Sequence, residues 1–197
     1  MEILKEDSPG VIEKCIKILA SGGVLLVPTE TVYGLVCDYE NMEAREKIYA
    51  LKQREKSKLL GAFLPDMAAV PPECKLSRKA VLLMEKFMPG ALTLVIPDGA
   101  GGTFGFRMPD HPFMQKLLQA YGKALAQTSA NLSGTPPALS VKEALATLDG
   151  ETSLVIDGGG IPRDSLSSTV VYVDGEETKV FREGAIKEEI IRSVIEK

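Results

Sequence analysis

The chain has 197 residues, of which 45% are hydrophobic and 25% are charged, and its formal net charge is −4. This composition is typical of a soluble globular protein with a sizeable core, and the apolar runs are too short to span a membrane. Charge is uneven, because residues 44–58 hold six basic and two acidic residues. A basic segment in an otherwise acidic chain predicts a local anion site rather than a general nucleic-acid surface.

Cysteine and histidine usage excludes several kinds of site. The three cysteines are widely spaced and form no CxxC pair, so we expect neither a disulfide framework nor a zinc site. The single histidine, His111, precedes Pro112 at a predicted helix start, which favours a turn role over a base or a metal ligand. Charged residues follow Leu4 at once, so no apolar signal-peptide core is expected and we predict a cytoplasmic protein.

In chain order, hydrophobic periodicity and breaker residues predict alternating helices and strands. Ser8-Pro9 is expected to cap the first helix, and Gly22-Gly23 to end it. Predicted helices then cover about 41–52, 80–87, 114–121, 141–148 and a C-terminal segment with Ile190, Ile191, Val194 and Ile195 inward. Predicted strands cover 24–27, 59–64, 91–97, 104–109, 124–130 and 153–159, with a hairpin over 168–181 that turns at Asp174-Gly175.

The interleaved elements show no repeat and no long linker. They predict one α/β domain, residues 1–197, with a mixed parallel and antiparallel sheet and flanking helices. The segment PTET, residues 28–31, interrupts two apolar runs without a hairpin signal. It predicts either a polar crevice lining or a threonine cap, at Thr29 or Thr31, of a short helix at 32–35.

Polar residues recur where predicted strands end, and ligands of open α/β sheets bind at such ends. Each of these residues also has a simple structural explanation as a turn former or a helix-end cation. Standard signatures are missing, since the sequence holds no GxxxxGK[ST] loop, no GxGxxG opening a helix and no GxSxG elbow. The polar stretches are 28–31, 52–54, Arg107, 128–131, 167–169 and Arg182.

These stretches resemble, in order, the motifs of the YrdC family, also called TsaC. The matching segments are PTETVYGL, the KxR at Lys52 to Arg54, FRMPDHP, SANLSG, STVV and REGAI, and they cover about residues 10–187. The resemblance implies a twisted mixed sheet with a concave basic crevice. It also implies L-threonylcarbamoyladenylate synthase activity, a nucleotidyl transfer that joins L-threonine, bicarbonate and ATP and releases pyrophosphate.

The resemblance further implies roles for individual residues. Lys52, Arg54, Ser129 and Asn131 would be catalytic, and no protein metal site is implied, because Mg²⁺ would arrive with ATP. Threonine would be held by Thr29, Arg107, Ser129 and Ser168, whereas ATP would be held by Lys52, Arg54, Thr103, Asn131 and Arg182. The product would serve tRNA modification through a downstream threonylcarbamoyl-transferase, with weak, salt-sensitive tRNA contact; neither a membrane partner nor an oligomeric state is indicated.

The chain departs from the family pattern at three positions. Glu55 and Glu183 replace prolines, and Phe63 stands where many members have a histidine. Because these positions belong to the motifs of the threonine and nucleotide pockets, two alternatives stay open. One is carbamoyl-type adenylate or transferase chemistry on another substrate, and the other is a non-catalytic module that binds double-stranded RNA or tRNA.

Two expectations concern the cations. Arg107 alternates with Phe104 and Phe106, so it shares a strand face with Gly105 and faces an open crevice if the phenylalanines pack inward. The alternative is a surface arginine paired with Asp110. Lys52 and Arg54 are expected to be exposed helix-end cations, whose replacement would leave the fold intact.

Overall fold

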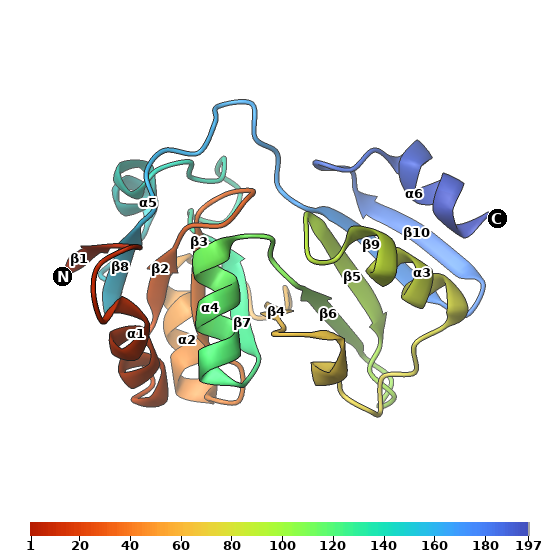
Figure 1. Ribbon diagram of the computed structural model, residues 1–197, viewed down its shortest axis with the longest axis horizontal. Coiled ribbons are helices and arrows are strands. Elements are labelled where there is room, and N and C mark those ends of the chain that lie inside the picture. The colour runs from red at the N-terminus through yellow and green to blue at the C-terminus, as the bar shows by residue number, and fades with distance from the viewer. Residues whose placement is uncertain (197) are drawn as a thin grey trace.

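The structure is a computed structural model that describes residues 1–196. A single mixed sheet of ten strands runs through it in the order β1-β8-β2-β3-β7-β4-β6-β5-β9-β10 (Figure 1). The strands are β1 Ile3–Lys5, β2 Leu25–Val27, β3 Gly34–Asp38, β4 Gly61–Phe63, β5 Leu92–Pro97, β6 Thr103–Arg107, β7 Leu125–Ser129, β8 Leu154–Asp157, β9 Thr169–Asp174 and β10 Glu177–Arg182. Both parallel and antiparallel neighbours occur, which confirms the predicted fold class.

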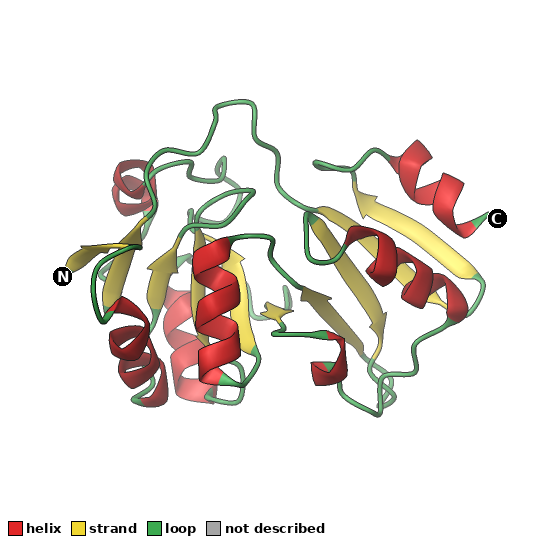
Figure 2. Cartoon of the chain, in the orientation of Figure 1, coloured by secondary structure: helices red, strands yellow, loops and turns green. Residues whose placement is uncertain are grey.

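Six α-helices flank the sheet (Figure 2). The helices are α1 Val11–Ala20, α2 Met42–Leu51, α3 Arg78–Phe87, α4 Pro112–Tyr121, α5 Val141–Thr147 and α6 Glu188–Ile195, with a 3-10 turn, η1, at Met67–Ala69. Helices α1 and α4 pack together beside the N-terminal strands, and α3 packs with α6 beside β5, β9 and β10. Within residues 1–196, every helix is too short or too polar to cross a bilayer.

The second half of the sheet buries one face and leaves the other open. Leu92, Leu94 and Ile96 of β5 are fully buried, and Phe104 and Phe106 of β6 join the same core. Period-two alternation therefore turns the intervening residues of both strands away from α3 and α6. This arrangement confirms that Arg107 and Gly105 share the face opposite the two phenylalanines.

The segment 28–33 is the connection of a β-hairpin, because β2 and β3 pair antiparallel. The predicted short helix at 32–35 is wrong. The Thr29 hydroxyl accepts hydrogen bonds from the amides of Thr31 and Val32, both at 3.2 Å, and donates to the Val32 carbonyl at 2.6 Å. A threonine turn thus replaces the Asn-Gly signal that the sequence lacks.

Other element ends differ by a few residues from the predictions. The N-cap of α1 is Gly10 at φ 72°, not Ser8, because a left-handed residue at this position starts the helix without a side-chain cap. The hairpin turn lies at Gly175-Glu176, one residue later than predicted, since Asp174 still pairs with Glu177. Ile190 is 45% exposed and faces outward, whereas Ile191 is buried.

Short or unusual signals account for the remaining differences. Strands β1 and β3 were not among the predicted strands. Only three residues of β1 pair with β8, in parallel, and β3 begins within the segment 32–35, for which a short helix was an alternative. The three cysteines, Cys15, Cys37 and Cys74, are free and buried, as expected for small apolar residues. His111 directly precedes α4, which has Pro112 at its first position.

Candidate functional site

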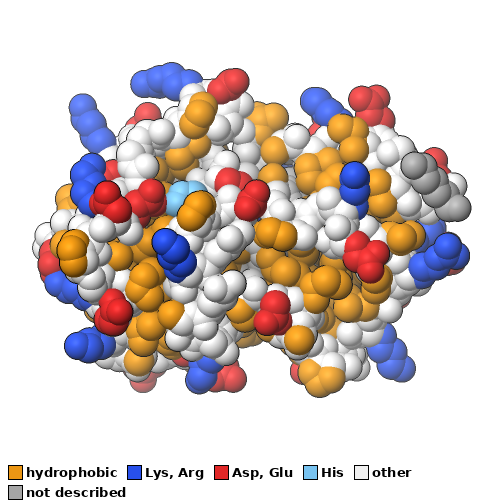
Figure 3. Space-filling view, viewed as in Figure 1, with side chains coloured by type: hydrophobic (Ala, Val, Ile, Leu, Met, Phe, Trp, Pro, Cys, Tyr) orange, Lys and Arg blue, Asp and Glu red, His pale blue; other side chains and the backbone are white. Residues whose placement is uncertain are grey.

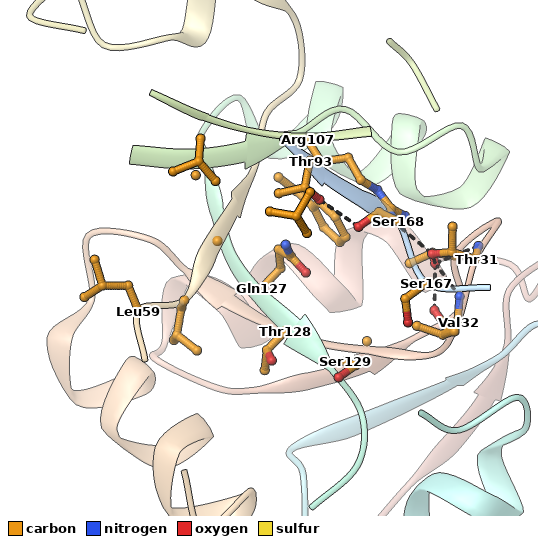
Figure 4. A pocket seen from close by; sticks show the side chains of 18 of the residues that line it. Thr31, Val32, Leu59, Thr93, Arg107, Gln127, Thr128, Ser129, Ser167 and Ser168 are labelled. Atoms are coloured by element: carbon orange, nitrogen blue, oxygen red, sulfur yellow. Dashed lines mark hydrogen bonds between the residues drawn. The ribbon is translucent and has the colours of Figure 1, made fainter. Parts of the chain in front are cut away.

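A cavity of about 360 Å³ opens on the uncovered face of the sheet (Figure 4). Its walls come from the β2–β3 connection, β4, β6, β7 and the start of β9, which are far apart in sequence. The structure thereby brings together most of the polar stretches that follow predicted strands. Seven predicted site residues line this cavity: Thr29, Arg54, Thr103, Arg107, Ser129, Ser168 and Arg182.

The cavity is strongly cationic. Four arginines line it, namely Arg45, Arg54, Arg107 and Arg182, and within residues 1–196 no aspartate or glutamate is among the lining residues. Burial lowers the pKa of Arg54, Arg107 and Arg182, but guanidinium groups remain protonated in proteins. Hydroxyl groups of threonines and serines cover much of the remaining wall, so the cavity can bind anions through charge-assisted hydrogen bonds.

Arg107 lies at the bottom of the site and is only 4% exposed. One terminal nitrogen donates to the Thr31 hydroxyl at 3.0 Å, and the other donates to a Glu30 carboxylate oxygen at 2.9 Å. The guanidinium carbon sits 5.2 Å from the centre of the Phe63 ring. The alternative of a surface arginine paired with Asp110 is therefore wrong, because Arg107 is buried and its partner is Glu30.

Arg182, at the end of β10, and Ser168, just before β9, form a second wall of the cavity. The Arg182 Nε and Nη2 groups donate to the Ser168 carbonyl at 3.2 and 2.9 Å. The Ser168 hydroxyl is 2.8 Å from the Thr93 hydroxyl of β5 (Figure 4). These bonds fix the entry into β9 and hold the Arg182 guanidinium at the cavity wall.

Lys52 does not line the cavity and lies beneath it, 1% exposed. Its ammonium donates to the Ser129 carbonyl and, at 2.6 Å, to the Asn131 carbonyl. Burial, and secondarily the charge of Arg54, lowers the pKa of Lys52 to about 8. The expectation of an exposed helix-end cation is therefore wrong, since Lys52 secures the backbone that follows β7.

Asn131 also lies beside the cavity rather than in its wall. Its amide nitrogen donates to the carbonyls of Leu132 and Thr135 at 2.8 and 2.7 Å. Its side-chain oxygen is buried and has no partner within residues 1–196. The side chain thus closes the loop after β7 and keeps one unused acceptor.

Arg54 follows α2 and belongs to the cavity wall. Its Nε and Nη2 groups donate to the carbonyls of Lys58 and Leu59 at 2.8 and 3.0 Å. These bonds bend residues 54–59 around the guanidinium, which keeps its other nitrogen free for a ligand. Gln53, at φ 46°, redirects the chain just before this turn.

Replacing Lys52 by methionine is expected to destabilise the fold by about 2 kcal/mol at neutral pH. Methionine keeps the buried stem but removes the donors, and each unsatisfied buried carbonyl costs about 1–3 kcal/mol, offset in part by the lost burial of a charge. Urea unfolding of the variant measures the change. Lys116→Met, at an exposed position of α4, is the matched control and should stay within about 0.5 kcal/mol. An equal loss of stability in Lys52→Met and Lys116→Met would contradict a buried structural role for Lys52.

The difference in unfolding free energy between wild type and Lys52→Met should depend on pH. The folded-state pKa of Lys52, about 8, lies below its ordinary value of 10.5, so below pH 8 the fold is less stable with charged Lys52 than it would be with the neutral amine. This penalty is relieved as pH rises from 8 towards 10.5, because the unfolded chain then binds more protons than the folded one. We expect the stability difference between wild type and Lys52→Met to grow by about 1–2 kcal/mol from pH 7.5 to 9.5. A constant difference would show that burial does not lower this pKa.

Of the three departures from the family pattern, only Phe63 reaches the cavity. Glu55 is exposed and lies 3.4 Å from Lys58, in the turn after α2. Glu183 is exposed as well, and its carboxylate accepts the Glu188 amide at 2.9 Å at the start of α6. The two glutamates therefore alter the family pattern only in a turn and at a helix start. Phe63 alters it inside the cavity, where its ring packs against the Arg107 guanidinium.

Sequence reasoning missed the lining residues Thr93 and Gln127, and it gave no binding role to Thr31 and Ser167, which lie within the predicted polar stretches 28–31 and 167–169. Gln127 and Ser129 alternate on β7, so period two could have placed Gln127 on the same face as the predicted Ser129. Glu30 was quoted within PTET but received no role, and its contact with Arg107 joins two segments that are 77 residues apart. Such a pairing has no local sequence signal.

Comparisons with known proteins agree on the family. Residues 17–184 match a family model named Sua5_yciO_yrdC and described as telomere recombination. Threonylcarbamoyl-AMP synthase of Mus musculus is 40% identical over 167 residues, covering 78% of this chain and 59% of the relative. The relative of the same name from Vibrio parahaemolyticus is 30% identical, with 87% and 98% covered.

Solved structures show the same fold. P. abyssi Sua5 complexed with L-threonine superposes with a TM-score of 0.86 at 28% identity, covering 98% of this chain and 60% of that one. E. coli YciO gives a TM-score of 0.83 at 26% identity, with 96% and 98% covered. This chain spans less than two thirds of the longer relatives but nearly all of the shorter ones. The family model alone covers most of the sequence, and the chain belongs to the Sua5/YciO/YrdC family.

Proposed function

We propose that the chain is a threonylcarbamoyl-AMP synthase, which joins L-threonine, bicarbonate and ATP and releases pyrophosphate. The observation that carries this proposal is a cavity with four arginines, abundant hydroxyls and no lining carboxylate within residues 1–196. All three substrates carry carboxylate, bicarbonate or phosphate groups, which such a cavity can hold together. Relatives named threonylcarbamoyl-AMP synthase, and a family structure complexed with L-threonine, support this choice.

The amino acid is assigned to the Arg107 side of the cavity. The Arg107 Nε group is buried and has no hydrogen-bond partner within residues 1–196, so a carboxylate bound at this edge would accept from Nε and from the neighbouring terminal nitrogen. Thr29, Ser129 and Ser168 lie around the same space and would contact the remaining groups of threonine. The Thr29 hydroxyl is committed to the turn at Val32, so its contact would be shared with that turn.

The triphosphate is assigned to Arg54, Thr103 and Arg182, which also line the cavity. Lys52 and Asn131 would act by holding the loop after β7, so that Ser129 meets the reacting groups.

In the proposed reaction, the threonine amine attacks the carbon of bicarbonate, and water leaves to give a carbamate. A carbamate oxygen then attacks the α-phosphorus of ATP, and pyrophosphate leaves. Both partners of the second step are anionic, so positioned cations supply most of the catalysis.

Mg²⁺ is assigned to the nucleotide rather than to the protein. Within residues 1–196, no cluster of three histidine, cysteine, aspartate or glutamate side chains could hold a metal. Phosphate oxygens, water and backbone carbonyls are the oxygen ligands that Mg²⁺ prefers. The ion would neutralise phosphate charge while ATP is bound.

The product is proposed to pass to a threonylcarbamoyl-transferase that modifies tRNA in the cytoplasm. Direct tRNA contact should be weak, because basic side chains of the stretch 44–58 already form ion pairs within that stretch. For example, the Lys56 ammonium lies 2.6 Å from the Glu46 carboxylate. On the face shown in Figure 3, basic and acidic side chains alternate without a continuous basic strip. We expect tRNA binding to fall steeply with salt and to ignore sequence, as measured by filter binding. A tight, sequence-selective complex at physiological salt would favour an RNA-binding function.

A pyrophosphate-release assay tests the proposed activity. Purified protein with ATP, Mg²⁺, bicarbonate and L-threonine should release pyrophosphate at a rate that depends on threonine. The related alternative, carbamoyl chemistry on another substrate, predicts release that is unaffected when threonine is omitted or replaced by serine. The same assay with other amino acids would then identify the substrate.

A further inference from the structure

Arg45 is the cavity arginine that has no role in the reaction described above. It lies near the start of α2, outside every segment that matches a family motif. The other three cavity arginines each donate hydrogen bonds to protein oxygens. Within residues 1–196, Arg45 has only a 3.5 Å contact from Nη1 to the Met42 sulfur, a weak acceptor, and its buried Nε has no partner. Because a guanidinium carries five N–H donors, most of those on Arg45 are available to a ligand.

The Tyr39 ring holds the Arg45 guanidinium at one end of the cavity. The guanidinium carbon lies 5.1 Å from the ring centre, which is a cation–π contact. The same ring packs edge-on against Phe104, with ring centres 5.8 Å apart. Phe104 directly follows Thr103, and Tyr39, Arg45 and Thr103 all line the cavity. Arg45 therefore lies near the start of β6 and is held there before a ligand binds.

Arg107 marks the other end of the cavity. Thr103, Gly105 and Arg107 line it from one face of β6, so this strand runs along the cavity from the side of Arg45 to that of Arg107. At roughly 3.3 Å per residue, Thr103 and Arg107 are about 13 Å apart along the strand. The cavity thus has two separate cationic ends, and the one at Arg107 is assigned to threonine.

The geometry of nucleotidyl transfer gives the two ends different roles. A carbamate oxygen forms a bond to the α-phosphorus, while the bond from this phosphorus to the α,β-bridging oxygen breaks and its electron pair leaves with pyrophosphate. The attacking and leaving oxygens lie roughly in line, on opposite sides of the phosphorus. With the carbamate of threonine held at Arg107, pyrophosphate departs towards the opposite end. A cation fixed at that end stabilises the negative charge that grows on the leaving group.

We propose that Arg45 binds the β- and γ-phosphates of ATP and stabilises the departing pyrophosphate. The inference rests on the proposed function, because it assigns a further contact in the same cavity. It adds to Arg54, Thr103 and Arg182 a cation from α2 that acts on the leaving group and does not contact the adenosine or the α-phosphate.

Ligands that differ only in their phosphates test this role. Arg45→Ala should weaken binding of the ATP analogue AMP-PNP about tenfold or more in titration calorimetry with Mg²⁺, as expected when hydrogen bonds to a charged group are lost. Binding of AMP, which lacks the β- and γ-phosphates, and of L-threonine should be unchanged. Lys47→Ala removes a cation from the same helix at an exposed position outside the cavity wall, and it should keep the wild-type affinity for AMP-PNP.

Turnover separates stabilisation of the leaving group from binding of ATP alone. At saturating ATP, Arg45→Ala should still release pyrophosphate about tenfold more slowly than wild type. The melting temperature should be nearly unchanged, because the lost contact with Tyr39 is offset by removing a cation that opposes the dipole at the start of a helix. A wild-type rate at saturating ATP would overturn the role on the leaving group.

The binding data have distinct contrary outcomes. Equal losses for AMP-PNP and AMP would place Arg45 at the adenosine or the α-phosphate and overturn the assignment. A loss for AMP-PNP no larger than in Lys47→Ala would also overturn it, because the effect would then be one of overall charge. A wild-type chain that binds neither AMP-PNP nor threonine would refute the proposed function itself, which is a different result from wild-type binding that the loss of Arg45 leaves intact.

Discussion

Replacing Arg107 by alanine is expected to weaken L-threonine binding about 100-fold or more. The proposed contact is a pair of charge-assisted hydrogen bonds to the threonine carboxylate, each worth about 1.5–3 kcal/mol. Arg107→Lys keeps the charge but loses the planar fork, so its loss should be about tenfold, or 1.4 kcal/mol. Titration calorimetry with threonine measures both variants, and ATP affinity should remain nearly unchanged in Arg107→Lys.

Folding must be checked in parallel, because Arg107 also neutralises Glu30 at 2.9 Å in a buried position. Removing one partner of such a pair leaves a charge without compensation, so Arg107→Ala should lower the melting temperature. The lysine variant can still reach Glu30, which makes it the cleaner test of ligand binding. Arg163→Lys, at an exposed position, is the control. Equal losses for threonine and ATP would indicate general misfolding, and no loss for threonine would remove Arg107 from the site.

Replacing Arg54 by alanine should lower turnover about 100-fold or more. Arg54 is assigned to the triphosphate, whose charge must be stabilised as pyrophosphate leaves, and losing one preorganised donor at a reacting centre typically costs a factor of about 100–1000. The steady-state rate of pyrophosphate release measures the effect.

Structural damage in Arg54→Ala should be modest, since its hydrogen bonds to the carbonyls of Lys58 and Leu59 lie in a surface turn. Circular dichroism should therefore show a folded variant, and Arg163→Ala should keep wild-type turnover. Normal turnover in Arg54→Ala would show that the segment 52–58 is a solvated surface and that the triphosphate binds elsewhere.

Much of the fold could be predicted because local patterns determined it. The spacing of Leu83, Met84 and Phe87 indicated α3, and alternation in β6 correctly placed Gly105 and Arg107 on one face. Boundaries were less accurate where a backbone conformation decided them. Gly10, at φ 72°, starts α1 without a side-chain cap, and the Thr29 hydroxyl forms a turn that no dipeptide signal announces.

The candidate site was less predictable, because its geometry depends on contacts between distant segments. Lys52 had the sequence context of an exposed helix-end cation, but the loop after β7 folds over it and buries the ammonium. Arg107 was expected to face an open crevice, with a surface pairing to Asp110 as the alternative, and no local signal indicated that the β2–β3 connection brings Glu30 to it. Their position at strand ends identified the polar stretches and the family resemblance gave them roles, but only the structure shows which of them line the cavity and which support it.

Transfer of the bicarbonate carbon is the sharpest test of whether this cavity couples threonine to ATP through bicarbonate. Protein supplied with ¹³C-bicarbonate, L-threonine, ATP and Mg²⁺ should form an adenylate that contains one ¹³C and threonine, detected by mass spectrometry after rapid quenching. Arg54→Ala should form little of this product, and Arg163→Ala should match the wild type. If wild-type protein is folded and binds both ligands but yields no labelled threonine-containing adenylate, the cavity does not carry out threonylcarbamoyl-AMP synthesis.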